Sequence, residues 1–315
     1  MRLVEEGIKP TFGGHEKFVF RYGWLKKGVD ALSENPAIFT DDKALVVLGV
    51  GKNMVRSIRH WCLAAGLFEE TRGKGPVRGL QLTDLADRLV TDNGWDPYLE
   101  DTGTLWLLHW QLTSNLTRTL IWHLTYCAYY EAEFTKKQLA AFISKQLDHR
   151  KITTTVGTVE REIDVCLRTY VTAMRGMTAE AISEETLDCP LAELDLMRFL
   201  PEDSVYRFNV GRKVTLPTEV FGYALLTFLP TIAGNRRTVA VDDCIYKDGS
   251  PGQVFKLDEN SVIEYLEALE ELTEGRLRLQ DTAGLRQLYL EHDSDGWFRT
   301  AALELLGRHY ARSGN

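Results

Sequence analysis

The stretch from Leu48 to Leu67 of this 315-residue chain carries the side chains best suited to binding a nucleic acid. A glycine turn at Gly49–Gly51 precedes a segment whose polar residues share one arc of a helical wheel at about 100° per residue. Lysine and arginine reach phosphates or guanine edges, and asparagine reaches the edge of adenine. The polar arc consists of Lys52, Asn53, Arg56, Ser57, Arg59 and His60.

This arc contains no acidic residue, whereas an ordinary surface helix usually mixes glutamate with its lysines and arginines. The opposite arc is apolar and consists of Met54, Val55, Ile58, Trp61, Cys62 and Ala65. We therefore interpret the segment as the recognition helix of a winged helix-turn-helix, with Asp41 to Leu48 as its supporting helix. A plain solvated helix face is the alternative.

The residues that follow this helix predict a wing. Two short strand patterns, 67–71 and 77–82, flank a basic glycine turn whose tip carries Arg72 and Lys74. A surface hairpin with solvated charges is the alternative. A helix from Thr83 to Thr91 closes the unit, so we expect residues 1–94 to form a winged-helix DNA-binding domain.

The charge of the whole chain argues against a generic polyanion binder. Its formal net charge is -8 at pH 7, which would repel nucleic acid over most of the surface. Between Lys52 and Arg78, however, six basic residues face only two acidic ones, Glu69 and Glu70. Contact with DNA is therefore expected at a local patch.

A second group of residues could cut a phosphodiester, which usually needs carboxylates on Mg²⁺ or a histidine paired with a polar group. His15 and Glu16 are the first candidates, because two glycines precede them and basic residues surround them. The alternative is a histidine that stabilises a turn and a glutamate paired with Arg21 or a lysine. Nearby basic residues that we also assign to DNA binding are Arg21, Lys26 and Lys27.

Other acidic groups are interpreted as solvated residues or helix caps. They are Asp96, Glu100, Asp101, Asp242, Asp243, Asp258 and Glu259. The turn at Gly49–Gly51 is not a nucleotide-binding P-loop, which would need glycine at Val46 and serine or threonine at Asn53. The residues therefore leave the metal undefined.

Five widely spaced cysteines without a CxxC pair indicate free thiols in a reducing compartment. The chain shows neither a signal-peptide pattern nor an apolar run of membrane-spanning length, so a cytoplasmic location is expected.

The remaining chain predicts a mainly α, or α+β, protein. Residues 95–200 form a central helical domain in which His109 and His123 are interpreted as core histidines among aromatic side chains. A possible second helix-turn-helix spans 136–149 and 156–171, but acids on its polar face favour a structural or protein-contact role. Residues 201–315 alternate short strands and helices as a small α+β region. Within it we expect a glycine-proline turn leading into a short strand after Pro251, a helix from Glu259 to Leu272 and a turn at 281–287. The threonines at 153–155 are expected to cap the helix that begins at Val156.

Several blocks resemble a known family: 13–18 with 21–27, 48–55 with 58–59, 105–110 and 249–252. The sequence is similar to the SspB-type nickase family of DNA phosphorothioation systems, which is catalogued as a domain of unknown function. The resemblance implies a DNA nickase for sulfur incorporation in antiphage defence. As a nickase, the protein would be expected to use a divalent metal, Mg or Mn. It also implies partners: DNA, a cysteine desulfurase, an ATP pyrophosphatase-type sulfur transferase and an ATPase.

No catalytic motif of the family can be transferred to particular residues, so three hypotheses stay open. The first is a DNA-binding nickase. The second is a DNA-binding adaptor that presents DNA to the sulfur-transfer proteins without cutting it. The third is a transcriptional regulator, which would place two recognition helices one DNA turn apart in a dimer.

Overall fold

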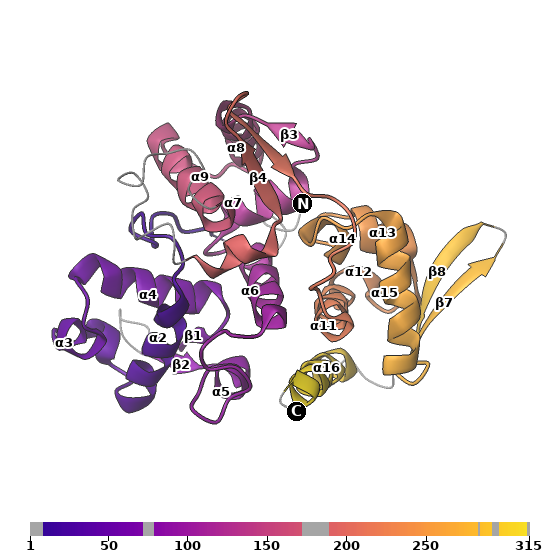
Figure 1. Ribbon diagram of the computed structural model, residues 1–315, viewed down its shortest axis with the longest axis horizontal. Coiled ribbons are helices and arrows are strands. Elements are labelled where there is room, and N and C mark those ends of the chain that lie inside the picture. The colour runs from indigo at the N-terminus through magenta and orange to yellow at the C-terminus, as the bar shows by residue number, and fades with distance from the viewer. Residues whose placement is uncertain (1–8, 72–78, 172–188, 283, 292–295, 314–315) are drawn as a thin grey trace.

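The computed structural model describes residues 9–71, 79–171, 189–282, 284–291 and 296–313, and it is mainly helical with three small antiparallel sheets (Figure 1). This confirms the α+β class expected from the sequence. The N-terminal helices lie at one end of the long axis, and the hairpin of β7 (Leu277–Thr282) and β8 (Leu285–Leu290) lies at the other, with helix α6 (Thr102–Ser114) between them.

The N-terminal part contains the helices and the strand pair expected from the sequence. Strands β1 and β2 pair in antiparallel register from Phe68 opposite Leu82 to Thr71 opposite Gly79. The identity of this N-terminal part as a winged helix-turn-helix stays a prediction. The elements are α2 (Tyr22–Glu34), η1 (Ile38–Thr40), α3 (Ala44–Leu48), α4 (Lys52–Ala64), β1 (Phe68–Thr71), β2 (Gly79–Leu82) and α5 (Asp84–Leu89).

Helix α3 is shorter than expected. The Asp41 carboxylate accepts the backbone N–H of Lys43, and residues 38–40 form a 3-10 turn, so the α-helix begins only at Ala44. Gly49 then ends α3 in the left-handed region, with φ of 65°, which glycine adopts without the steric cost of a Cβ. The glycine turn thus sets the direction in which α4 begins.

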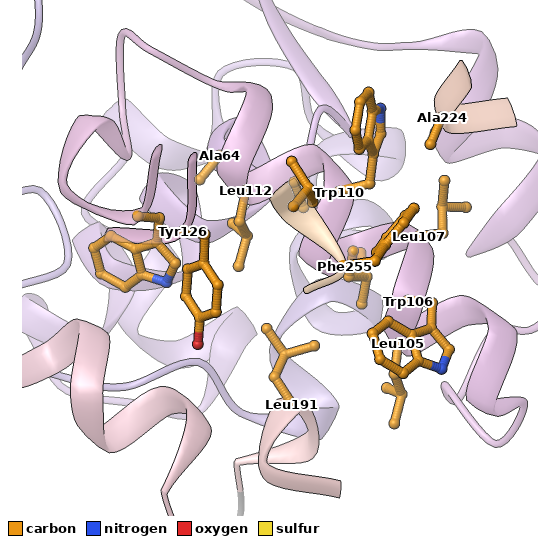
Figure 2. Close-up of a cluster of buried hydrophobic side chains, with 14 of the residues drawn as sticks. Ala64, Leu105, Trp106, Leu107, Trp110, Leu112, Tyr126, Leu191, Ala224 and Phe255 are labelled. Atoms are coloured by element: carbon orange, nitrogen blue, oxygen red, sulfur yellow. The ribbon is translucent and has the colours of Figure 1, made fainter. Parts of the chain in front are cut away.

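Helix α6 (Thr102–Ser114) is buried on nearly all sides and lies at the centre of the hydrophobic core. Figure 2 shows its Trp106 and Trp110 beside Phe255, which comes from the C-terminal part of the chain. His109 on the same helix is bonded through both ring nitrogens, to the Tyr170 hydroxyl at 2.7 Å and to the Val254 carbonyl at 2.8 Å. Its interpretation as a core histidine is confirmed.

The two helices of the possible second helix-turn-helix begin at threonine caps. Thr135 and Gln138 form a capping box, and the Thr155 hydroxyl accepts the N–H of Thr158. A three-stranded sheet of order β3-β5-β4 lies next to them. This part contains α7 (Leu120–His123), the π-helical turn η2 (Leu124–Ala128), β3 (Glu133–Phe134), α8 (Lys136–His149), α9 (Val156–Tyr170), η4 (Pro190–Leu194), β4 (Met197–Leu200) and β5 (Val205–Phe208).

The C-terminal part differs from expectation in two places. A short strand was expected after Pro251, but the Ser250 hydroxyl caps a helix there. The turn expected at 281–287 is narrower, because it joins two six-residue strands of a hairpin that pair up to Thr282 opposite Leu285. The elements are α11 (Thr218–Phe228), α12 (Pro230–Ala233), β6 (Thr238–Ala240), α13 (Val241–Tyr246), α14 (Pro251–Val254), α15 (Glu259–Leu272), β7 (Leu277–Thr282), β8 (Leu285–Leu290) and α16 (Trp297–Ser313).

All five cysteines are buried free thiols, as the sequence indicated. Among the described residues, no helix is long and apolar enough to cross a membrane.

Candidate nucleic-acid interface

The N-terminal half of α4 presents cationic and amide side chains at the surface. Lys52, Asn53 and Arg56 are exposed, and the Arg56 side chain retains 57% of its accessible area. The residue that precedes the helix, Gly51, offers no side-chain cap for the first N–H groups. Positive charge from these N–H groups and from the two cations therefore lies at one exposed helix end.

Ser57 and His60, which the helical wheel places on the same arc, are buried, at 0% and 5% exposure. The Ser57 hydroxyl donates to the His15 carbonyl at 3.0 Å, so the residues before α2 cover this part of the helix. Burial is the main cause that lowers the pKa of His60 well below its ordinary value, and nearby His15 lowers it further. A neutral, buried imidazole at this position supports the helix and does not face a ligand.

Gly14 makes the close approach of this turn possible. A Cβ on Gly14 would lie 2.4 Å from Nδ1 of His60, which no real side chain tolerates. The glycine pair before His15 indicated a tight turn in the sequence. The sequence did not show that His60 of α4 packs against this turn.

His15 and Glu16 point to different surroundings. The His15 side chain is buried, with Nε2 3.1 Å from the Glu162 carboxylate on α9, and its Nδ1 accepts the N–H of Lys17. Glu16 instead pairs with Arg56 at 3.2 Å. Glu16 and Lys17 both have positive φ, at 48° and 71°, a conformation that costs energy in residues with side chains.

Arg59 meets a carboxylate too. Its Nη2 lies 3.2 Å from Oε1 of Glu70 on β1, and the same oxygen accepts a hydrogen bond from Arg118 at 2.8 Å. The donor arc is free of acids along its own helix, but the fold supplies Glu16 and Glu70 from neighbouring segments. Lys52 and Asn53 remain without a partner among the described residues.

The other basic residues assigned to DNA binding have mixed surroundings. The Arg21 guanidinium lies over the Trp24 ring at 5.2 Å, and Lys26 is tied to Asp30 and Asp92 at 2.5 and 2.6 Å. Lys27 is exposed and donates to the Leu48 carbonyl at 3.4 Å. The Lys26 ammonium group is therefore neutralised by two carboxylates of the protein. The predicted wing tip, with Arg72 and Lys74, lies outside the described residues.

Several of the carboxylates that the sequence offers to a metal are engaged in protein contacts. Asp96 accepts two backbone N–H groups and the Thr104 hydroxyl, and Asp101 contacts His309 at 2.9 Å. Asp258 caps α15, and Glu259 pairs with Arg286. In the described part of the chain, no three His, Cys, Asp or Glu side chains gather to hold a metal ion. These residues do not fit a divalent-cation site, and we assign no reaction step through one.

Comparisons with known proteins place this geometry in a wider context. A family model described as a protein of unknown function (DUF4007) matches residues 12–310. The magnesium ion-bound SspB crystal structure is 28% identical, with a TM-score of 0.86 over 98% of this chain and 90% of that one. Another SspB crystal structure is 29% identical, with a TM-score of 0.86 over 99% and 91% of the two chains. No curated protein matches the sequence.

Proposed function

This chain belongs to the DUF4007 family of proteins of unknown function, and we propose that it is the DNA-binding component of a bacterial DNA phosphorothioation and antiphage defence system. Its similarity to SspB structures along nearly the full chain supports the system. The exposed cationic end of α4 carries the DNA-binding part of the proposal. By the same resemblance, its partners are a cysteine desulfurase, an ATP pyrophosphatase-type sulfur transferase and an ATPase.

In this proposal, α4 reads duplex DNA as the recognition helix of a winged-helix domain spanning residues 1–94. Lys52 and Arg56 contact phosphates, and Asn53 contacts the edge of adenine. Arg56 exchanges its Glu16 partner for a phosphate, and the exchange costs little because an exposed ion pair contributes at most about 1 kcal/mol.

Binding is tested with Arg56→Ala and a labelled duplex, by fluorescence anisotropy over a range of salt concentrations. Loss of one phosphate contact should flatten the slope of log affinity against log salt by about one unit. Arg207→Ala is the matched control, because Arg207 is similarly exposed and also paired with a glutamate, Glu133. An unchanged slope in Arg56→Ala would exclude α4 as the docking helix.

We further propose that the protein nicks one strand, and that the turn holding His15 and Glu16 is the first place to seek the chemistry. Glu16 is partly exposed and next to Arg56, whereas buried His15 serves to position the turn. Supercoiled plasmid is incubated with the protein and Mg²⁺ or Mn²⁺. Nicked circles from the wild type, lost in Glu16→Gln and retained in Glu133→Gln, are the expected result.

A DNA-binding adaptor is the second candidate, because the acidic residues Asp96, Asp258 and Glu259 are engaged in helix caps and ion pairs. Plasmid left intact by the wild type with both metals, together with normal duplex binding, would favour the adaptor. A footprint at one defined operator would favour a transcriptional regulator.

A further inference from the structure

A groove beside α4 combines cations with an aromatic ring, away from the exposed helix end described above. Its volume is about 790 Å³, and it lies between α4, the turn at 36–40, strand β2 and the segment around Arg118. The residues that matter are Lys9, Phe39, Arg59, Glu70 and Arg118. Three cationic side chains therefore line a groove on a chain of net charge -8.

The two arginines converge on one point from separate segments. Their guanidinium groups both reach Oε1 of Glu70, at 3.2 Å from Arg59 and 2.8 Å from Arg118. Paired guanidinium groups bind the oxygens of a phosphate group in the same way as those of a carboxylate. The Glu70 carboxylate therefore stands where an anionic ligand would be held.

The position of these arginines does not depend on Glu70 alone. Arg59 is fixed by α4. Arg118 follows Asn115, whose amide donates to the Leu63 and Ala64 carbonyls at the end of α4 and whose side-chain oxygen accepts the Arg118 N–H. The pair is therefore preorganised, and binding an anion in place of Glu70 requires little rearrangement.

Phe39 provides an apolar surface in the same groove. It is half-buried, with its ring in an edge-to-face contact with Phe68 at 5.6 Å. A cationic groove with an aromatic ring is the arrangement by which proteins bind single-stranded nucleic acid, because the bases stack and the phosphates are neutralised. A duplex offers the ring no unstacked base.

We infer that this groove binds a single-stranded segment of nucleic acid, with one phosphate between Arg59 and Arg118 in place of the Glu70 carboxylate and a base against Phe39. The inference rests on the proposed DNA-binding function and deepens it, because it gives the protein a second contact for an opened strand beside its duplex contact. Glu70 then acts as an internal competitor of the phosphate.

The test measures the affinity of the full chain for a labelled oligothymidine strand and for a duplex, by anisotropy at one salt concentration. Glu70→Gln keeps the side-chain shape but removes the competing charge, and it should raise strand affinity about fivefold. Glu69→Gln is the matched control, because this substitution removes the same charge one residue away. The Glu69 side chain is exposed and accepts a hydrogen bond from Gln81. Unfolding cannot produce a gain of affinity.

Phe39→Ala should lower strand affinity about tenfold through lost stacking and leave duplex affinity unchanged. Phe39→Leu keeps most of the packing on Phe68, and it should show the same loss. Equal effects of Glu70→Gln and Glu69→Gln, or wild-type strand affinity in both Phe39 variants, would overturn the inference. The proposed duplex contact fails separately, when Arg56→Ala leaves duplex binding unchanged.

Discussion

The Glu162 carboxylate lies 3.1 Å from Nε2 of His15, and both side chains are buried. The same carboxylate accepts the backbone N–H of Gly13 at 2.5 Å. Because Nδ1 of His15 accepts the N–H of Lys17, Nε2 is the ring nitrogen directed at Glu162. Helix α9 therefore fixes the turn that covers α4 and places Glu16 beside Arg56.

Removing Glu162 should destabilise the protein strongly. Glu162→Ala removes the acceptor of the Gly13 N–H and the carboxylate that lies 3.1 Å from Nε2 of buried His15, and we expect a loss of about 2 kcal/mol in unfolding free energy. Thermal melting of this variant is compared with that of Glu160→Ala, which changes an exposed residue of the same helix. Similar melting temperatures in the two variants would show that the pair contributes little.

Two glycines of α2 should respond in opposite ways to the same substitution. A Cβ on Gly28 would lie 2.5 Å from the Cys62 sulfur, so Gly28→Ala must push α2 away from α4. Gly23 has open space around its Cβ position, and Gly23→Ala should gain up to about 1 kcal/mol from helix propensity. We expect Gly28→Ala to cost about 1–3 kcal/mol through overpacking. Chemical denaturation measures both, and stabilisation by Gly28→Ala would contradict this packing.

Acidification should destabilise the fold through two buried histidines. Burial lowers the pKa of His60 well below the ordinary range and that of His109 to about 3. Below pH 6.5 the unfolded chain binds protons that these folded residues do not, so stability falls by up to about 1.4 kcal/mol per pH unit for each. Urea unfolding at several pH values measures this slope.

A substitution of either buried histidine by glutamine should make that acid slope shallower. His149→Gln is the control, because His149 is exposed at the end of α8. The account fails if His149→Gln flattens the slope as much as His60→Gln or His109→Gln.

Alkaline conditions should weaken a different contact. Burial opposes the charged form of His123, but Cys127 and the Asp248 carboxylate at 2.9 Å raise its pKa to about 10. Because the pKa of His123 is raised in the folded state, the stability that its charged form contributes is complete below pH 6.5. This stability is lost as the pH rises toward 10. In Asp248→Asn this alkaline decline of the melting temperature should be smaller than in the wild type.

The control for this substitution is Asp243→Asn, because Asp243 of α13 pairs with Lys247 and not with a histidine. A decline that is unchanged in Asp248→Asn would assign the alkaline loss to other groups.

Much of the secondary structure was predictable because its signals are local. Helix α15 spans Glu259–Leu272 as its sequence pattern indicated, and α9 begins at the expected threonine cap, Thr155. The helix at Pro251–Val254 was mistaken for a strand, since Ser250 followed by proline is also a helix start. The β7–β8 hairpin was not predicted, although Leu277 and Leu279 alternate with Arg278 and Gln280 in the pattern of a half-buried strand.

The candidate site was predictable in its chemistry but not in its contacts. Periodicity placed Lys52, Asn53 and Arg56 on one helix face, where they are exposed. It could not show that the turn around Gly14 buries Ser57 and His60 on that same face. A helical wheel describes one helix and contains no information about the segment that packs on it.

The sequence by itself determined the mainly helical class, the free thiols, the family resemblance and the acid-free donor face of α4, because each depends on neighbouring residues or on composition. Only the tertiary structure decided that His15 is buried against Glu162, that Arg56 meets Glu16, and that Arg59 and Arg118 converge on Glu70. These pairs join segments far apart in the chain. Their geometry depends on how the helices pack, and packing is a property of the whole fold.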